Sequence, residues 1–351
     1  MTDLSVIIPI YNAEAHLEAL VATLREQRVL GPEATINAEV LLVDDGSNDA
    51  SPAMLDRIAH EHPAVVVLQS RHGGPAEARN AGLAAASGKY VYFMDQDDYI
   101  VPGTLECMMA VLASAGADTV HFAYAQPTVE QVDEWRAKSI GTPVWEGPTT
   151  GVEFLKADKL FLNTGLWNNI YSMDVIRRHA IRFSSEVKSF YEDAVFNYLY
   201  YLRAGRVVCT DSVGYLWVQN LSSESRSTEL GHMAERQSQG SALALFYFDM
   251  YRRYLAEDGH DSGLVEKFLS NARWHCYAFW NDMLRMRGLT RAEALEALRE
   301  QSARGLMPIA GTYPYYMNRP YKLSIGTRMA WTMISHTSLL RLLIYFRLPS
   351  T

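Results

Sequence analysis

The chain has 351 residues, a formal net charge of -8 and 48% hydrophobic residues. This length and composition predict a folded domain with a large core plus a substantial further region, and they exclude a disordered chain. The negative net charge argues against a general nucleic-acid-binding protein.

The N-terminal residues MTDLSVIIPIYN form a strand-like apolar run and lack the basic and apolar regions of a secretory signal. No apolar stretch reaches the roughly 18 to 20 residues that a membrane-spanning helix needs. The three cysteines lie far apart, with the spacing of neither a metal site nor a disulfide framework. We therefore expect a cytoplasmic protein with reduced cysteines.

The first hundred residues alternate between strand-like apolar runs and segments with helical periodicity. In chain order, the pattern predicts a strand at 4–10, a helix at 13–27, a strand at 38–45, a helix within 47–62, a strand at 64–69, a helix within 73–88 and a strand at 89–95. Apolar strands separated by amphipathic helices are typical of a mostly parallel sheet covered on both faces. We therefore predict an α/β sandwich.

The rest of the chain is more mixed. We expect a strand at 119–125, a polar loop or insertion at 126–148, a helix at 191–204, short strands within 206–218 and a helical region from about 228.

Polar clusters follow three of the predicted strands: PIYN after the first, DDGS after the second and DQDD after the fourth. Ligands of such sheets bind outside the carboxyl ends of the strands, so these clusters should converge on one edge. In an extended segment Asp95 and Asp97 point the same way, and two hard oxygen donors suit Mg²⁺ or Mn²⁺. A solvated turn, with Asp98 capping the next helix, is the alternative, and both interpretations stay open here.

The DDGS cluster has a similar ambiguity. Asp49 or Ser51 fits a helix cap, and we favour that role for Asp49. Asp44 and Asp45 lie at the strand end itself, where a carboxylate can accept a hydrogen bond from a nucleobase N–H or a ribose hydroxyl.

Four segments now identify a family. They are, in chain order, SVIIPIYNAEAHL, EVLLVDDGSNDAS, GGPAEARNAGLAAASGKYVYFMDQDD, and LWNNIYSMDVI followed by YEDAVF. In this order and at these spacings, the four segments resemble family 2 glycosyltransferases of the GT-A fold. The resemblance implies a GT-A catalytic domain at 1–220, with a nucleotide-sugar-binding half at 1–125 and an acceptor half at 150–220. A helical region at 228–351, which hardly resembles the family, completes the chain.

The resemblance implies transfer of a sugar from a nucleotide donor, with a UDP-sugar as the expected donor. The acceptor would be a saccharide or lipid-linked saccharide, and the configuration at the anomeric carbon would be inverted. It assigns roles to eight residues at the donor. Pro9, Tyr11 and Asn12 would line the base pocket, Asp44 would bind the base, Asp45 would lie near the ribose or base, Arg79 would reach toward the nucleotide, Asp95 would contact the ribose or metal, and Asp97 would ligate Mn²⁺ or Mg²⁺. A surface helical charge is the alternative for Arg79.

Inversion also needs a base that removes the proton of the acceptor hydroxyl. The family's base position matches the pair Glu192 and Asp193, and we assign the role to Asp193. Acidic residues in a first helical turn also stabilise the helix through its dipole, which is the interpretation we favour for Glu192.

Two positions depart from the family pattern. His72 stands where the family often has Asn before the glycine pair, and Asn169 stands where it often has Lys or Arg. We interpret His72 as a polar loop residue. Trp167 is either a platform on which a sugar stacks or a core residue, with the core favoured.

From residue 301 onward the chain has no Asp or Glu but six basic side chains. With its aromatic residues, 301–351 could dock on anionic lipids at the inner face of the plasma membrane. Packing of the helical region on the catalytic domain or on a second subunit is the alternative.

Two other functions were weighed. A nucleotidyltransferase would normally carry a Gly-rich basic loop near the first strand, and PIYNAEAHL has no glycine. A noncatalytic nucleotide- or carbohydrate-binding protein on the same scaffold would not need Asp44, Asp95, Asp97 and Asp193 together, so the enzyme is favoured.

Overall fold

The computed structural model describes residues 2–157, 165–187, 191–218, 230–256, 261–283, 290, 292, 294–296 and 298–299. The chain forms two compact units, 1–227 and 228–351. The predictions for 301–351 lie outside the described residues. Among the described residues, no helix is both long enough and apolar enough to cross a membrane.

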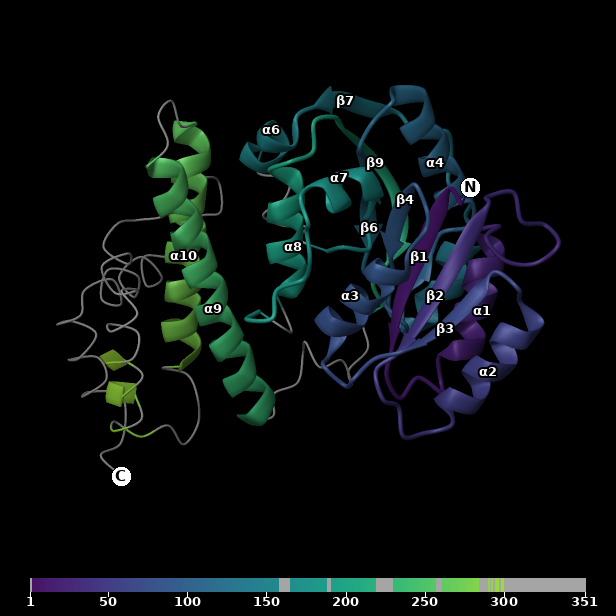
Figure 1. Ribbon diagram of the computed structural model, residues 1–351, viewed down its shortest axis with the longest axis horizontal. Coiled ribbons are helices and arrows are strands. Elements are labelled where there is room, and N and C mark those ends of the chain that lie inside the picture. Colours follow the sequence, from purple (N-terminus) through teal and green to yellow (C-terminus); the bar gives the residue numbers. More distant parts are fainter. Residues whose placement is uncertain are drawn as a thin grey trace. The chain divides into compact units, whose positions relative to one another are not determined.

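The first unit is built on a mixed sheet (Figure 1). Its described strands are β1 (Leu4–Ile10), β2 (Ala38–Asp44), β3 (Val65–Gln69), β4 (Tyr90–Phe93), β5 (Tyr99–Ile100), β6 (Thr119–Ala125), β7 (Trp145–Thr149), β8 (Asn169–Ser172) and β9 (Val207–Leu216). They lie in the order β3-β2-β1-β4-β8-β6-β9-β5, and β7 pairs with β9.

The helices of this unit are α1 (Leu17–Glu26), α2 (Ser51–Glu61), α3 (Pro75–Ala85), α4 (Thr104–Ala115), the 3-10 turn η1 (Val129–Gln131), α5 (Val132–Arg136), α6 (Gly151–Lys156), α7 (Met173–Arg178) and α8 (Glu192–Tyr201). The strand and helix order predicted for the first hundred residues is confirmed.

The direction of the strands decides where a ligand can bind. The first four strands pair in parallel, with β1 between β2 and β4 and with β3 outside β2. The next strand in the sheet, β8, is antiparallel to both β4 and β6, and β9 is parallel to β6. The carboxyl ends of β1, β2, β4, β6 and β9 therefore share one edge, together with the amino end of β8.

Helices cover both faces of the sheet. On one face, α1, α2 and α4 pack through Leu17, Leu55 and Leu105 on alternate residues of β1, including Val6 and Ile8. On the other face, the intervening residue Ile7 of β1 contacts α3, which lies on that side of the sheet (Figure 1). There α3 approaches so closely that a Cβ on its Gly82 would lie 2.5 Å from Ile7 Cγ2.

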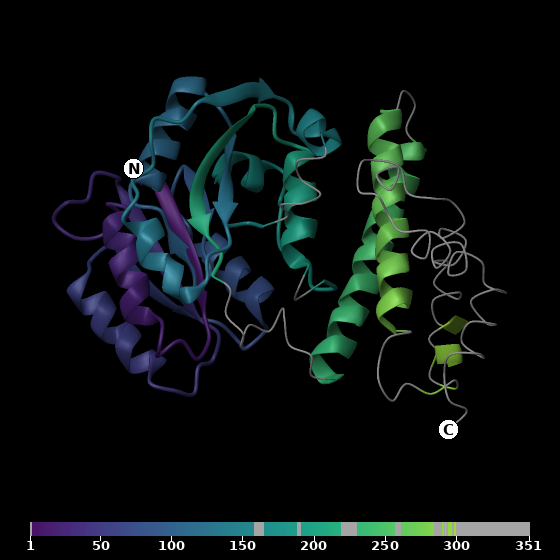
Figure 2. The ribbon, with the colours of Figure 1, turned by 180° about the vertical axis from the view of Figure 1, so that it is seen from behind.

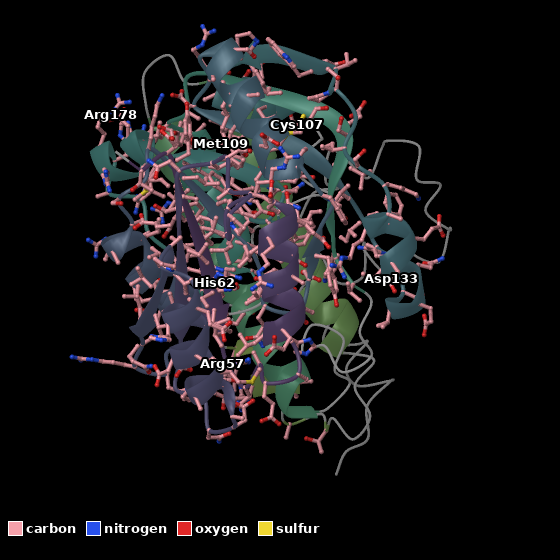
Figure 3. All side chains as sticks on the ribbon, turned by 90° about the vertical axis from the view of Figure 1, so that its right-hand side faces the viewer. Arg57, His62, Cys107, Met109, Asp133 and Arg178 are labelled. Carbon is pink, nitrogen blue, oxygen red and sulfur yellow. The ribbon has the colours of Figure 1, made fainter. Side chains whose placement is uncertain are left out.

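Polar contacts tie the outer helices together as well. Arg57 on α2 forms an ion pair with Glu18 on α1, and His62 Nε2 lies 3.1 Å from Arg25 Nη2. Arg57 and His62 are labelled in Figure 3. Because the first of these contacts lies between exposed side chains, it contributes little to stability.

The polar stretch 126–148 differs from the prediction of a loop or insertion. It contains η1, α5 and most of β7. Arg136 of α5 forms an ion pair with Glu26, and Trp145 of β7 pairs with Thr210 of β9. An exposed edge strand can be held by its backbone hydrogen bonds to a neighbouring strand without alternating apolar and polar residues. The hydrophobic periodicity of the sequence therefore did not predict β7.

The second unit contains two described helices that pack on each other, α9 (Leu230–Leu255) and α10 (Ser262–Met283), as Figure 2 shows. Its buried residues include Leu243 and Tyr247 on α9 and Leu264 and Phe268 on α10. The helical character expected from about residue 228 is therefore present in the described part of this unit.

Candidate active site

The DQDD segment crosses the carboxyl edge of the sheet between β4 and β5. Asp98 is buried there, with 5% of its surface exposed. Its carboxylate accepts a hydrogen bond from the Tyr215 hydroxyl at 2.7 Å and from the Val218 N–H at 2.9 Å. Burial and the nearby Asp97 and Asp95 raise the pKa of Asp98 well above its usual range. Asp98 thus anchors the end of β9 and does not cap α4, whose N-cap residue, Gly103, makes no side-chain cap bond.

Gln96, to which the sequence assigned no role, joins two of the clusters. Its Oε1 accepts a hydrogen bond from the Tyr11 N–H at 2.8 Å, and its Nε2 donates to the Tyr11 carbonyl at 3.0 Å. The Tyr11 side chain is 39% exposed, and its ring lies 4.9 Å from that of His72. The preceding Pro9 is partly buried in β1. A half-exposed ring held at the sheet edge is suited to contact a planar ligand.

The loops after β1 and β2 are bonded to each other. Asn12, whose backbone has φ 47°, donates its N–H to Ser47 Oγ at 3.0 Å. Its Oδ1 accepts from the Asn48 N–H at 2.9 Å. Asp44, with 2% of its surface exposed, accepts from the Ser47 N–H at 2.9 Å. Asn12 and Asp44 therefore shape the connection between PIYN and DDGS.

Asp45 is engaged by a third loop. Its two carboxylate oxygens accept hydrogen bonds from the N–H groups of Gly73 at 3.1 Å and Gly74 at 2.8 Å. Gly74 has φ +83° with ψ 179°, a conformation that a side chain would strain. His72 Nδ1 lies 2.7 Å from the Asp45 carbonyl oxygen. As expected, His72 is a polar loop residue, and this loop begins α3.

Arg79 lies on α3 and is buried, with 6% of its surface exposed, so the alternative of a surface helical charge is wrong. Its Nη1 donates to Glu192 Oε1 at 2.6 Å, and its Nη2 donates to Asp95 Oδ1 at 2.8 Å. The guanidinium carbon also lies 5.6 Å from the centre of the Phe183 ring. One cation thus joins α3, the end of β4 and the first turn of α8.

Glu192 has a larger role in the site than the sequence indicated. Its side chain is only 8% exposed, and it bonds to Arg79, so its role extends beyond the helix dipole. The two residues are 113 positions apart in sequence, and no spacing rule connects them. The sequence did carry one signal that Arg79 is buried and needs an acidic partner: it is a charged residue among the small residues of α3, which packs against β1.

The two remaining carboxylates have perturbed acidity. Burial and the negative charge of Asp95 raise the pKa of Asp97. Burial, Glu192 and Asp95 raise the pKa of Asp193 well above its usual range, against the opposing effects of its hydrogen bond from the Ala194 N–H and of Arg79. Raised pKa values in a cluster of carboxylates are typical of functional sites.

These side chains fit a divalent cation. Asp95 and Asp97 offer hard oxygen donors, and a positive charge beside them would offset the repulsion that raises the pKa of Asp97. Among the described residues, no group of three or more His, Cys, Asp or Glu side chains forms a complete metal cage. The donor set therefore suits a cation whose coordination is completed by a ligand's oxygen atoms.

The segment around Trp167 is mostly internal. Asn169 is fully buried. Its Oδ1 accepts from the Tyr201 hydroxyl at 2.6 Å and lies 2.8 Å from His121 Nδ1. Trp167 stacks on Tyr215, with ring centres 4.5 Å apart and planes at 10°. Asn169 is therefore a core residue, and Trp167 packs against the core as favoured.

The comparisons with known proteins decide the family. The family model "Glycosyl transferase family 2" matches residues 5–183, just over half of the chain. The chain belongs to glycosyl transferase family 2. This membership makes it a glycosyltransferase and disfavours both the nucleotidyltransferase and the noncatalytic alternative.

Curated relatives agree with this assignment. The uncharacterized glycosyltransferase EpsJ of Bacillus subtilis is 25% identical over 244 residues, which cover 69% of each chain. The poly(ribitol-phosphate) beta-N-acetylglucosaminyltransferase TarS of Staphylococcus aureus is 27% identical over 229 residues, 65% of this chain and 37% of TarS. The chain thus spans little more than a third of TarS.

Solved structures support the fold. The crystal structure of S. aureus TarS 1-349 has a TM-score of 0.66 at 19% identity, covering 98% of this chain and 90% of that one. The mannosyltransferase PcManGT from Pyrobaculum calidifontis, in complex with GDP-Man and Mn2+, has a TM-score of 0.53 at 17% identity and covers 98% of this chain and 86% of its own. The expected GT-A fold with a following helical region is confirmed.

Proposed function

We propose that this protein is an inverting, metal-dependent glycosyltransferase that moves a sugar from a nucleoside-diphosphate sugar to a saccharide acceptor in the synthesis of a cell-surface polysaccharide. The observation that carries the proposal is the group of carboxylates at the carboxyl edge of the sheet, in which Asp97 and Asp193 lie near Asp95 and Arg79 binds Asp95. TarS has also been crystallised with UDP-GlcNAc. A UDP-sugar is therefore the first donor class to test.

The donor's nucleotide would bind at the ends of β1 and β2. The half-exposed Tyr11 ring can contact the base, with Pro9 beside it. Asp44 has one carboxylate oxygen on the Ser47 N–H, which leaves the other oxygen as an acceptor for a base N–H. Asn12 and Asp45 would act mainly by holding the surrounding loops, since their side chains bind backbone N–H groups of those loops.

The donor's diphosphate would lie at the DQDD segment. Asp97, with Asp95 beside it, would hold Mn²⁺ or Mg²⁺ together with the diphosphate oxygens. A bound divalent ion would supply stabilisation of the negative charge that develops on the leaving nucleoside diphosphate. Arg79, fixed on Asp95, would add a positive charge on the same side of the donor.

In the transfer step, the acceptor hydroxyl attacks the anomeric carbon of the donor sugar. The bond between that carbon and the diphosphate oxygen breaks, and its electron pair leaves with the nucleoside diphosphate. The proton of the hydroxyl passes to the carboxylate of Asp193. A raised pKa makes this carboxylate a better proton acceptor than an ordinary aspartate. Attack from the face opposite the leaving group inverts the anomeric configuration.

For the whole chain, we propose a catalytic domain at 1–220 followed by a helical region at 228–351. The division of the chain between residues 227 and 228 supports this boundary. A lipid-linked saccharide at the inner membrane face is our candidate acceptor, reached through the six basic side chains of 301–351. Pelleting with anionic liposomes should decrease when a full-length variant carries glutamine at these six positions, and unchanged pelleting would exclude this attachment.

The reaction can be tested with purified protein and a panel of nucleotide sugars. We expect Mn²⁺- or Mg²⁺-dependent release of a nucleoside diphosphate, together with transfer to an oligosaccharide acceptor. NMR of the product should show the anomeric configuration opposite to that of the donor. Release that is unaffected by EDTA would contradict the metal requirement, and retained configuration would contradict inversion. An E18Q variant, changed at an exposed position on α1, serves as the matched control.

A further inference from the structure

Glu192 lies beside the proposed base but faces a different partner. Its side chain is 8% exposed and pairs with the 7%-exposed side chain of Arg79 at 2.6 Å. Arg79 uses its other terminal nitrogen on Asp95 at 2.8 Å, and that carboxylate is 35% exposed. The buried end of this chain of contacts is therefore Glu192, and the accessible end is Asp95.

Stability alone is a poor explanation for such an arrangement. Taking both charges of a buried ion pair out of water costs as much as their attraction returns, and apolar side chains of similar volume often serve a fold equally well. Here Glu192 Oε2 and Arg79 Nε are also buried without a hydrogen-bond partner among the described residues. Two buried polar atoms without a partner cost stability, so the pair is poorly explained by stability alone.

The geometry links the two parts of the proposed reaction centre. Glu192 and Asp193 are the first two residues of α8, and successive helical side chains point about 100° apart. When Glu192 is held on Arg79, the direction of Asp193 is fixed as well. Arg79 is itself fixed on α3, which is packed tightly against β1 through Gly82. The sheet, α3 and α8 thus set the distance between Asp95 and Asp193.

We propose that Glu192 is a positioning residue for sugar transfer: through Arg79 it holds the Asp95 carboxylate at the donor and fixes the first turn of α8, with Asp193, at the acceptor. This inference rests on the proposed function, since it gives Glu192 a role in that reaction. Glu192 itself does not contact substrate. Its contribution is the relative placement of the groups that do.

The first test is E192Q, which keeps the size of the side chain and one acceptor oxygen but removes the charge that holds Arg79. A misplacement of about 1 Å in a reaction centre can cost about 100-fold in rate. We expect kcat to fall about 10- to 100-fold, while the KM values for donor and acceptor change by less than about threefold. Because a loss of folded protein would also lower the apparent kcat at unchanged KM, kcat is calculated per folded enzyme, with the folded fraction measured by circular dichroism on the same sample.

The second test replaces the ion pair by apolar side chains of similar volume in the variant R79M/E192L. We expect it to keep the melting temperature of the wild type within a few degrees and to lose at least about 100-fold in kcat. If this variant does not fold, E192Q still decides the question. The control is D118N. Asp118 accepts hydrogen bonds from the N–H groups of Gly205 and Arg206 at 2.8 and 2.9 Å, at the opposite edge of the sheet, so its loss should lower the melting temperature and leave kcat unchanged.

The outcomes separate the inference from the proposed function. If the wild type transfers no sugar from any nucleotide donor, the proposed function fails and the inference with it. If the wild type is active and E192Q keeps its kcat, the inference alone is overturned. The inference is also overturned if activity in every variant merely follows the folded fraction, as in the control. A loss of kcat in folded E192Q, with near-normal KM values, supports it.

Discussion

Two acidic clusters meet at the same edge of this sheet, and their surroundings differ. At the end of β2, Asp45 accepts hydrogen bonds from the N–H groups of Gly73 and Gly74, and Asp44 accepts from the Ser47 N–H. Around β4 and α8, Asp97 and Asp193 lie among other carboxylates, and their pKa values are raised. In the first cluster, backbone N–H groups satisfy the carboxylates, whereas in the second the carboxylates lie among other negative charges.

The difference shows that an acidic motif has no fixed role. Backbone N–H groups stabilise the charge of a carboxylate and fix its orientation, which suits a residue that shapes a loop. Neighbouring carboxylates and burial destabilise the charge, which suits a residue that binds a cation or accepts a proton. Both clusters lie at the same sheet edge, and they differ in their hydrogen-bond partners and in the charges around them. The comparison predicts that substitutions of Asp97 and Asp193 reduce the reaction rate and that substitution of Asp45 reduces stability.

The largest effect is expected for D193N. Asparagine has nearly the same shape as aspartate but cannot accept the proton of the acceptor hydroxyl. We expect kcat for transfer to fall about 10²- to 10⁴-fold, the usual contribution of a general base, with donor affinity nearly unchanged. Steady-state kinetics and calorimetric titration with the donor measure both quantities. Wild-type kcat in this variant would remove Asp193 from the role of base.

A smaller but still large effect is expected for D97N. Loss of one cation ligand should raise the Mn²⁺ or Mg²⁺ concentration needed for half-maximal activity and lower kcat at saturation by about 10²- to 10³-fold. Excess EDTA should abolish wild-type activity, and added metal should restore it. The matched control is D49N, whose partly exposed Asp49 accepts hydrogen bonds from the Ser51 and Glu14 N–H groups. If D97N and D49N show the same metal dependence, Asp97 is not a ligand.

The pH dependence of activity and of stability should run in opposite directions. Asp193 accepts a proton only when ionised, so kcat should fall about tenfold per pH unit below its raised pKa. In the folded state this carboxyl binds its proton more tightly than in the unfolded state. Its contribution to the free energy of unfolding is therefore fully present below the ordinary pKa of aspartate and is lost as pH rises through the raised value.

D193N isolates this effect, because asparagine resembles the protonated acid at every pH. The free energy of unfolding of D193N minus that of the wild type should increase with pH across this window, by about 1.4 kcal/mol for each unit of pKa shift. Urea unfolding at a series of pH values measures the difference. A difference that is independent of pH would mean that Asp193 has an ordinary pKa.

Much of the structure of residues 1–125 could be predicted from the sequence, because local patterns determine it. β1 and β6 begin and end where the apolar runs do, and Pro52 lies in the first turn of α2. Partners far apart in sequence could not be predicted. The pairs Arg79–Glu192 and Gln96–Tyr11 depend on how the sheet assembles, which no local pattern encodes. The same limit applies to β7, an edge strand defined by its neighbour.

The smallest effect on activity is expected for D45N, in the satisfied cluster. Asparagine keeps one acceptor oxygen but turns an NH₂ group toward a backbone N–H, so either Gly73 or Gly74 loses its hydrogen bond. Because Asp45 is buried, the free energy of unfolding should fall by about 1–3 kcal/mol, the cost of an unsatisfied buried polar group. Transfer by the folded protein should keep kcat within a few-fold, since the loop that begins α3 is strained but not removed. Urea unfolding and kinetics on the same sample measure both. A loss of kcat comparable to that of D193N, with unchanged stability, would show that Asp45 contacts the donor directly and that the two clusters share one role.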